Sequence, residues 1–350
     1  MLEIHEDLLA SLVDPRSAAT FRRPSRIGVE SAWYGHVPFG YWLTCQARPR
    51  VLVELGTHNG VSYSAFCDAV LDSNLATRCF AIDTWLGDQS AGLYGEEVYK
   101  NFRQFHDQRY SAISTQLRMT FDEALGQIPD GTIDLLHIDG EHTYDAVRHD
   151  FESWLPKLSN RAVILFHDTN VRERNFGVWR LWHELRQVYP GFEFLHASGL
   201  GVLAIGQQVS PTVASLCSIA SDDSIAVIRQ RFARLGEWCE SESRLLLLRA
   251  QVNRLTEEQQ RWQSELSVRA ATAELALGEA RRAWTDAEHE LGEYRQELSD
   301  AHRQISAMGE QLAVANASVN AATRELDWLR QTAAALSTER DIILRSTICA

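Results

Sequence analysis

The chain is poor in lysine and in paired cysteine, and both shortages narrow the class of protein. Only two of its 34 basic residues are lysines, Lys100 and Lys157, and the formal net charge is −13. An acidic chain has no general attraction to nucleic acid or anionic lipid, so we expect no nucleic-acid partner. The six cysteines form no C-x-x-C pair and no disulfide-like cluster, which favours a reducing, cytoplasmic location.

Long apolar runs are also missing. A membrane-spanning helix needs about 18 or more consecutive apolar residues, and no window of the chain approaches this length. The first residues lack the charged-then-apolar pattern of a signal peptide. We therefore expect no transmembrane segment, and we expect any association with an inner membrane to be peripheral and made through partners.

Proline is confined to one part of the chain. All eight prolines lie at or before Pro211, whereas residues 212–350 have none and are rich in Ala, Glu, Gln, Leu and Arg. This shift predicts two domains. Residues 1–211 would be globular with an N-terminal helical cap, and residues 212–350 would be a helical linker and a coiled coil. With 45% apolar residues, the chain can bury a full core.

Strand-like apolar runs alternate with helix-like segments in the first of these domains. The runs span residues 51–55, 79–83, 116–119, 133–139, 162–167, 192–196 and 202–205. This alternation predicts an α/β fold with a doubly wound, Rossmann-like and mostly parallel sheet. A short glycine-containing segment joins the last two runs, which predicts an antiparallel hairpin at one edge of the sheet.

The second domain carries a long seam of apolar residues. Over residues 273–336 they recur at alternating spacings of three and four, with no charged residue at nineteen consecutive seam positions. This predicts a coiled coil, roughly 95 Å long as one continuous helix. An earlier seam over residues 248–266 joins it through a stutter. The pattern leaves open the number and orientation of strands, and whether the helix forms a homo-oligomer or pairs with another protein.

The glycine pattern of dinucleotide-binding proteins, G-x-G-x-x-G, is absent. That pattern places a phosphate at a helix N-terminus. Here the first predicted strand carries Glu54 and leads to Gly56 and Gly60, with His58 between them. A carboxylate aimed at this crevice would repel a phosphate and suits a cationic ligand. Asp83 ends the next strand, where it can accept ribose hydroxyls. Alternatively, these are two ordinary strands with incidental acids.

A second group of polar residues follows two further predicted strands. Asp139 and His142 come after the fourth run, and His167 and Asp168 end the fifth. Ligands of such sheets bind outside the carboxyl ends of the strands, so position and chemistry agree. The segment 145–158 between the two groups has one apolar face and is predicted to be a helix that packs on the core.

These motifs together resemble a known family. Those at residues 33–39, 54–56, 137–144 and 166–169 are similar to methyltransferase family 24, a class I group of enzymes that depend on S-adenosylmethionine (SAM). The resemblance covers about residues 30–207, and its motifs are fairly specific. It implies the Rossmann-like methyltransferase sheet and SAM as the cofactor.

The same resemblance suggests how SAM is held. Glu54, Gly56, Gly60 and Asp83 are the predicted cofactor-binding residues. Phe121 follows the third predicted strand, where this fold contacts adenine, and is predicted to stack on the base. A phenylalanine after a strand is, however, also an ordinary core residue.

Related enzymes are O-methyltransferases that hold a divalent metal through an Asp after the fourth strand and an acidic pair after the fifth. Carried over, the ligands are Asp139, His167 and Asp168, and the metal is Mg or Mn. His167 departs from the family, which has Asp or Glu there. Magnesium prefers oxygen ligands, whereas imidazole suits Mn, Fe, Co or Zn. The alternative for His167 is a structural histidine that hydrogen-bonds the neighbouring loop.

Methyl transfer to a hydroxyl needs a base to take its proton. His142 stands three residues after Asp139, where catechol-type relatives have a lysine base. A histidine with an ordinary pKa is largely neutral at pH 7. We therefore predict that His142 is the base and that Asp139 lies beside it in the reaction centre. The alternative for His142 is a structural or substrate-orienting role.

The resemblance thus predicts a SAM-dependent O-methyltransferase. Its acceptor would be a hydroxyl of a sugar or glycan in bacterial polysaccharide biosynthesis, and this substrate is implied by the resemblance alone. The alternative is a non-catalytic coiled-coil scaffold whose methyltransferase-like head binds the cofactor without turnover.

Overall fold

The computed structural model describes residues 23–88, 92–173, 175–286 and 291–348. The first 22 residues of the predicted helical cap, and the predicted seam position Ala287, lie outside these ranges. The chain divides into two compact units, Met1–Ser243 with Ala335–Ala350, and Arg244–Ala334.

The first unit is built around a seven-stranded sheet. Its strands are β1 (Val51–Leu55), β2 (Arg78–Asp83), β5 (Ser114–Arg118), β6 (Ile133–Ile138), β7 (Leu158–His167), β8 (Gly191–Phe194) and β9 (Leu200–Ala204). They lie in the order β5-β2-β1-β6-β7-β9-β8. The β7–β9 and β8–β9 pairs are antiparallel, and the other four pairs are parallel. The predicted α/β fold and its antiparallel edge are confirmed.

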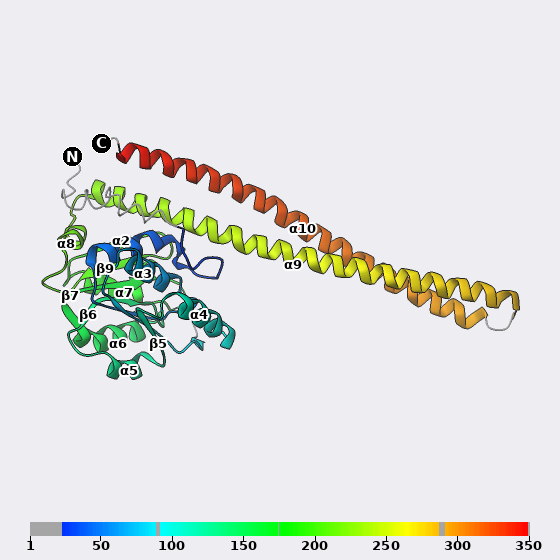
Figure 1. Cartoon of the computed structure of the whole chain (residues 1–350), viewed down its shortest axis with the longest axis horizontal. Helices are drawn as coiled ribbons and strands as arrows, with labels where there is room; N and C mark the ends of the chain where they lie inside the picture. The colour runs from blue at the N-terminus through cyan, green and yellow to red at the C-terminus, as the bar shows by residue number, and fades with distance from the viewer. Residues whose placement is uncertain (1–22, 89–91, 174, 287–290, 349–350) are drawn as a thin grey trace. The chain divides into compact units, whose positions relative to one another are not determined.

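Helices cover both faces of this sheet (Figure 1). They are α2 (Val37–Ala47), α3 (Val61–Asp72), α4 (Glu96–Arg109), α5 (Phe121–Ala124), α6 (Tyr144–Trp154), α7 (Val178–Leu185) and α8 (Pro211–Cys217). Short 3₁₀ helices are η2 (Trp33–His36), η3 (Leu125–Gln127) and η4 (Leu155–Lys157), and β3 (Gly87–Asp88) pairs with β4 (Gly92–Leu93). Helices α2 and α3 pack on one face, and α6 and α7 pack on the other.

The sheet is buried from both sides, which explains its uniformly apolar runs. All five residues of β1 are buried. Leu52 packs in the core beneath α2 and α3, whereas Val53 packs in the core beneath α6 and α7. Because successive side chains of a strand point to opposite faces, both positions must be apolar when both faces are covered.

The first unit continues well into the long helix α9 (Asp222–Asp286). Phe232 and Cys239 belong to the same core as α2 and α3. A Cβ at Gly236 would lie 2.0 Å from the carbonyl oxygen of Gly35, so the helix backbone rests directly on η2. The globular unit therefore extends past residue 211, where the change in composition placed the predicted boundary.

The second unit pairs the part of α9 from Arg244 onward with the part of α10 (Leu291–Ile348) up to Ala334, in antiparallel fashion (Figure 1). Leu245 packs with Leu326 and Leu329, and farther along the pair Gln259 hydrogen-bonds Asn316. The predicted seam is thus divided between two helices of the same chain that pack against each other. It does not run along one continuous helix. Association of this pair with another chain stays a prediction.

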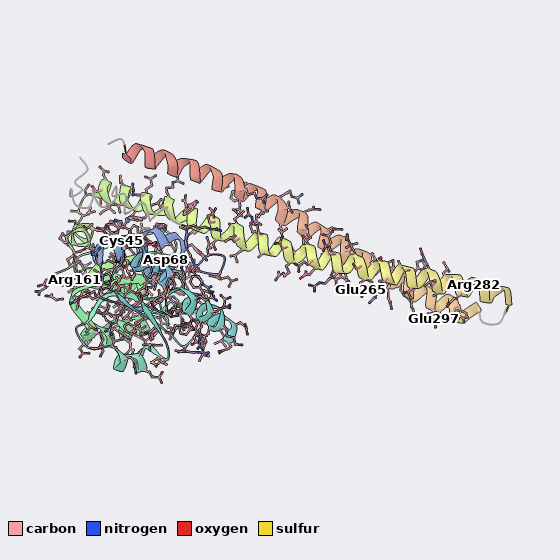
Figure 2. All side chains as sticks on the ribbon, in the orientation of Figure 1. Cys45, Asp68, Arg161, Glu265, Arg282 and Glu297 are labelled. Atoms are coloured by element: carbon pink, nitrogen blue, oxygen red, sulfur yellow. The ribbon has the colours of Figure 1, made fainter. Side chains whose placement is uncertain are left out.

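The outer surface of the helix pair is charged. Glu265 on α9 and Glu297 on α10 are exposed (Figure 2). Across the pair, Arg244 forms an ion pair with Glu325 at 2.6 Å. Within the described ranges, none of the helices combines the length and the apolar character that crossing a bilayer requires.

Candidate active site

A cavity of about 670 Å³ opens at the carboxyl ends of β1, β2, β6 and β7. This is the edge where ligands of doubly wound sheets bind. Of the predicted site residues, all but Glu54 line it. These are Gly56, Gly60, Asp83, Phe121, Asp139, His142, His167 and Asp168.

Gly56 allows the ends of β1 and β6 to meet. It has a φ of +90°, and a Cβ built on it would lie 1.9 Å from the carbonyl oxygen of Asp139. The amide of Asp139 in turn donates to the carbonyl of Leu55 at 2.8 Å. Only glycine tolerates both the left-handed backbone and this close approach. In this structure, Gly56 therefore serves to position Asp139.

Glu54 lies inside the packed fold and outside the cavity, which departs from the expectation that it contacts the cofactor. It is fully buried, and its Oε1 lies 2.9 Å from Nδ1 of His137. Nε2 of His137 accepts from Nε1 of Trp33 at 3.2 Å, so Nδ1 carries the proton that is donated to Glu54. Burial raises the pKa of Glu54, and the hydrogen bond from His137 opposes this. The strand period directs Glu54 to the side of α3.

Asp83 sits where the sequence predicted, at the end of β2. Its two carboxylate oxygens accept from the backbone amides of His58, at 2.8 Å, and Trp85, at 2.7 Å. Burial raises its pKa, and the hydrogen bonds from these amides oppose the rise. The two amides fix the carboxylate at the cavity wall, and each oxygen keeps a lone pair for a further donor.

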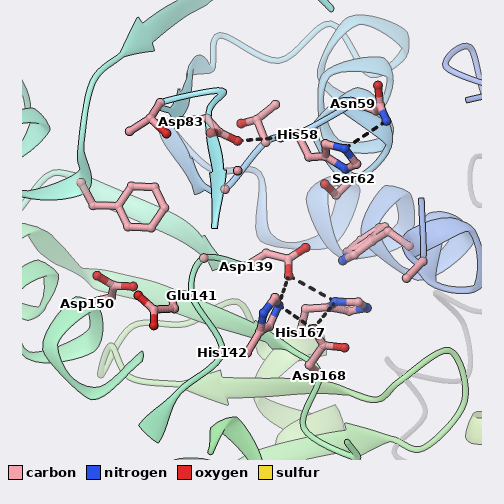
Figure 3. A pocket seen from close by; sticks show the side chains of 18 of the residues that line it. His58, Asn59, Ser62, Asp83, Asp139, Glu141, His142, Asp150, His167 and Asp168 are labelled. Atoms are coloured by element: carbon pink, nitrogen blue, oxygen red, sulfur yellow. Dashed lines mark hydrogen bonds and ion pairs between the residues drawn. The ribbon is translucent and has the colours of Figure 1, made fainter. Parts of the chain in front are cut away.

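Four side chains converge at the ends of β6 and β7 (Figure 3). Nε2 of His142 lies 2.8 Å from Oδ2 of Asp168 and 3.7 Å from Oδ1 of Asp139. Nδ1 of His167 lies 3.2 Å from Oδ1 of Asp139 and 3.3 Å from Oδ2 of Asp168. Each imidazole therefore bridges both carboxylates. The sequence identified all four residues, and the fold brings them together.

The charges in this cluster stabilise one another. Burial alone would lower the pKa of His142, but its hydrogen bonds to Asp139 and Asp168 outweigh burial and raise it to about 9. The same carboxylates raise the pKa of His167 well above its ordinary value. Conversely, His167 and His142 overcome burial and lower the pKa of Asp168 to about 2. Without another cation, His142 is protonated at pH 7, which is opposite to the neutral form that its predicted role as a base requires.

The two histidines approach the carboxylates from different sides. One donor atom from each of Asp139, His142 and Asp168 lies within 4.8 Å of the other two. His167 belongs to β7 and is nearly buried, with its ring 5.7 Å from that of His36. It therefore holds the two carboxylates from the side of the core, whereas His142 approaches them from the loop before α6.

The backbone at Asp168 and the contacts of His142 orient the side chains of this cluster. Asp168 has a φ of +61°, which is a strained conformation for a residue with a side chain and is typical of functional sites. The His142 ring stacks on Phe176, with centroids 4.6 Å apart, and the amide of Gly177 donates to the carbonyl of His142 at 2.7 Å. The loop after β7 therefore holds the loop after β6.

The opposite end of the cavity contains Phe121 and an acid that the sequence analysis missed. Asp150 on α6 lines the cavity and is 8% exposed. Burial raises its pKa to about 7; the nearby carboxylates of Asp122 and Glu141 add to the rise, and His149 opposes it. Asp150 could have been noticed in the sequence, because it is an acid on the apolar face of the helix predicted over residues 145–158.

Residues 53–169 match the family model of a methyltransferase domain. The chain carries a methyltransferase domain. This match begins within β1 and includes β2, β6, β7 and all four residues of the converging cluster. It confirms the resemblance that the motifs indicated.

Other similarities extend over more of the chain. The uncharacterized protein y4gI of Sinorhizobium fredii (strain NBRC 101917 / NGR234) is 50% identical over 200 residues, which are 57% of this chain and 22% of that protein. The chain therefore spans only a small part of this relative's length.

Two solved structures are also similar to this chain at low identity. The Podospora anserina methyltransferase PaMTH1, bound to SAH, is 13% identical over 58% of this chain and 89% of its own, with a TM-score of 0.39. A methyltransferase from Geobacter sulfurreducens is 19% identical over 55% of this chain and 89% of its own, with a TM-score of 0.37.

Proposed function

We propose that the methyltransferase domain is an active, SAM-dependent O-methyltransferase that acts on a hydroxyl of a sugar or glycan. The observation that carries this proposal is the cavity itself. At its two sides it combines a fixed acid at the end of β2 with a convergent group of carboxylates and imidazoles at the ends of β6 and β7. The sugar is supported by the family resemblance alone.

The electrostatics of the cavity suit the cofactor. Its volume is typical of a small-molecule site. The carboxylates that line it favour a sulfonium cation and oppose a phosphate; they belong to Glu30, Asp83, Asp122, Asp139, Glu141, Asp150 and Asp168. We assign Asp83 to the ribose hydroxyls and Phe121, which lines the same cavity, to adenine.

The residues present also fit a divalent cation. Asp139 and Asp168 supply oxygen and His142 supplies Nε2, a mixed set that suits Mn²⁺ better than Mg²⁺. Such an ion would lower the pKa of an acceptor hydroxyl bound to it. Because a cation at the two carboxylates removes the reason for the raised pKa of His142, we assign His142 as a ligand. His167 then positions both carboxylates through Nδ1.

Calorimetry with S-adenosylhomocysteine tests the cofactor assignment. We expect binding, and we expect Asp83→Asn to weaken it by roughly 10–100-fold, since a hydrogen bond to a charged group contributes about 1.5–3 kcal/mol. Asp130→Asn is the control, because Asp130 pairs with Lys157 on the surface and does not line the cavity. A folded protein that binds neither SAM nor S-adenosylhomocysteine would refute the proposal and favour the scaffold.

Chelation and Asp139→Asn test the metal assignment. We expect Asp139→Asn to lower the affinity for Mn²⁺ and the turnover of a responsive sugar nucleotide or glycan fragment by at least about 100-fold. Affinity for S-adenosylhomocysteine should stay within about twofold, because Asp83 holds the cofactor at another strand end. Full turnover after exhaustive chelation would remove the metal from the mechanism and would require a base other than His142, which is protonated at pH 7 when no cation is present.

A further inference from the structure

A second cavity, of about 410 Å³, lies beside α7 and shares no lining residue with the first. Three of its residues, Trp179, Trp182 and Arg186, recur along one face of the helix and its C-cap. Thr169 lines it at the end of β7, Arg172 follows in the next loop, and Glu193 belongs to β8. Nothing in the proposed methyl transfer uses this cavity.

Its aromatic side chains are held rigidly. Trp182 is 5% exposed and lies flat on the sheet, because a Cβ at Gly201 would come within 2.5 Å of its ring. Trp179 is 36% exposed, yet its Nε1 donates to the carbonyl of Phe176 at 2.9 Å, which fixes the indole. The cavity thus has one aromatic ring in the core and one that solvent can reach.

Two arginines line this cavity without a carboxylate partner. The guanidinium of Arg172 lies 4.8 Å from the centroid of the Trp179 ring, and that of Arg186 lies 5.8 Å from the centroid of Trp182. Nη1 of Arg186 donates to the carbonyl of Tyr189 at 3.2 Å. Across the part of the chain that the structure describes, no acid forms an ion pair with either guanidinium. Two arginines and one glutamate, Glu193, line the cavity, so its charged side chains sum to a positive charge in a chain of net charge −13.

A buried hydroxyl adds a further unused group. Thr169 is 1% exposed, and its Oγ1 has no hydrogen-bond partner among the described residues. A buried hydroxyl without a partner costs about 1–3 kcal/mol, so such groups usually face water or a ligand. Thr169, Arg172 and Glu193 line the same cavity.

We propose that this cavity binds an anionic saccharide, that is, a sugar ring that carries a phosphate or a carboxylate. Arginine suits both anions, because its planar fork of N–H donors matches their oxygens. The negative face of an indole attracts the weakly positive C–H hydrogens of a sugar ring. Glu193 can accept from sugar hydroxyls, and Thr169 can donate to a ring or anion oxygen.

The site lies next to the proposed reaction centre. Phe176 stacks on His142 of the first cavity, and its carbonyl accepts from Trp179 of the second. Thr169 directly follows Asp168 in the chain. One loop therefore borders both cavities. An anionic saccharide bound in the second cavity could therefore be the methyl acceptor whose hydroxyl reaches the first. That link depends on the proposed function, whereas binding itself does not.

Calorimetry and tryptophan fluorescence of the full chain test the proposal with four probes at constant ionic strength. They are glucose 1-phosphate, glucuronic acid, glucose and inorganic phosphate. We expect at least one anionic sugar to bind at least tenfold more tightly than both glucose and phosphate, and the tighter of the two identifies the anion. Equal binding of phosphate and glucose 1-phosphate, or no binding of any probe at about 10 mM, would overturn the proposal.

Variants assign the binding to this cavity. Arg172→Gln with Arg186→Gln should weaken binding of the anionic sugar by at least tenfold and leave the affinity for S-adenosylhomocysteine unchanged. Arg148→Gln is the matched control, because Arg148 pairs with Glu152 on the exposed side of α6. An unchanged sugar affinity in the double variant would overturn the site. If the wild-type protein binds the anionic sugar but does not bind S-adenosylhomocysteine, only the proposed function is refuted.

Discussion

The two compact units are held together in different ways. The first unit buries large aromatic side chains on both faces of its sheet, for example Trp42 and Phe66 on one face and Trp154 on the other. The second unit buries only a narrow seam, in which Leu329 is 3% exposed. Losing one side chain of a two-sided core affects the whole unit, whereas a seam along two helices can open locally.

Polar groups also serve different purposes in the two units. In the first, buried acids such as Asp139 and Asp168 gather at one edge of the sheet, where ligands bind. In the second, the hydrogen bond between Gln259 and Asn316 links the two helices. A polar pair in a helix seam favours the register that joins its members, at a cost in stability. The polar groups of the first unit therefore gather at the ligand-binding edge of the sheet. Those of the second unit set the register of the two helices.

The largest expected effect comes from ending the chain at residue 211, before most of α8 and all of α9, or at residue 243, after the packed segment of α9. A chain that ends at residue 211 loses the buried residues Ile228, Phe232, Leu235 and Cys239. At about 1.5–3 kcal/mol each, their loss removes roughly 6–12 kcal/mol, which equals the whole stability of a typical domain. A chain that ends at residue 243 keeps them. Thermal unfolding followed by circular dichroism should show a cooperative transition in the longer chain alone, and equal melting of both chains would contradict the packing of α9.

The next effect separates a structural acid from a ligand-binding one. Glu54→Ala leaves the Nδ1–H of His137 without its buried partner, so the first unit should lose about 1–3 kcal/mol of unfolding free energy. Asp83→Asn should instead lower the affinity for the cofactor, with a much smaller change in the free energy of unfolding. Denaturant unfolding of both variants, beside calorimetry, checks this. A Glu54→Ala protein that is fully stable and fails to bind S-adenosylhomocysteine would restore the direct role predicted from the sequence.

A seam substitution tests whether the second unit opens by itself. Leu329→Ala should lower the local stability of the helix pair by about 2 kcal/mol and speed hydrogen exchange there roughly 30-fold. Affinity for S-adenosylhomocysteine and exchange in the sheet should not change. If the sheet amides also lose protection, the two units unfold as one, and the contrast between them is wrong.

The smallest effect depends on pH. The pKa of Asp150 is about 7 in the folded protein and about 3.9 when unfolded. The folded state therefore binds the extra proton between these values, and the unfolding free energy falls as pH rises from about 4 to 7. Asp150→Asn removes the ionisable group, so the unfolding free energy no longer falls over this pH range. Because water reaches the open cavity, we expect a gain of about 1–2 kcal/mol at pH 8 and almost none at pH 4.

Denaturant unfolding of the wild type and Asp150→Asn at both pH values measures this difference. Asp130→Asn is the control, since the Asp130 side chain is 71% exposed and does not line the cavity. A gain of the same size at pH 4 and pH 8 would show that ionisation of Asp150 does not cause it.

Local patterns determined much of this protein before any contact was known. The run from Val51 to Leu55 matches β1 residue for residue, because a parallel strand covered on both faces must be apolar throughout. The acids after β6 and β7 were identifiable as site residues, because the carboxyl ends of parallel strands meet at one edge. Residues 53–169, which match a methyltransferase domain, contain the end of the first pattern and the whole of the second.

Tertiary structure decided what residues separated in sequence do to each other. The period of a strand could not show that Glu54 would meet His137 beneath α3, or that His142 would be charged by two carboxylates from different strands. Composition could not show that Phe232 belongs to the globular core, since its helix continues unbroken into the second unit. The apolar seam was correctly recognised as helical, but its period is the same for one rod and for two antiparallel helices. Only the contacts between α9 and α10 distinguish these arrangements, because a heptad pattern records which face is buried and not what buries it.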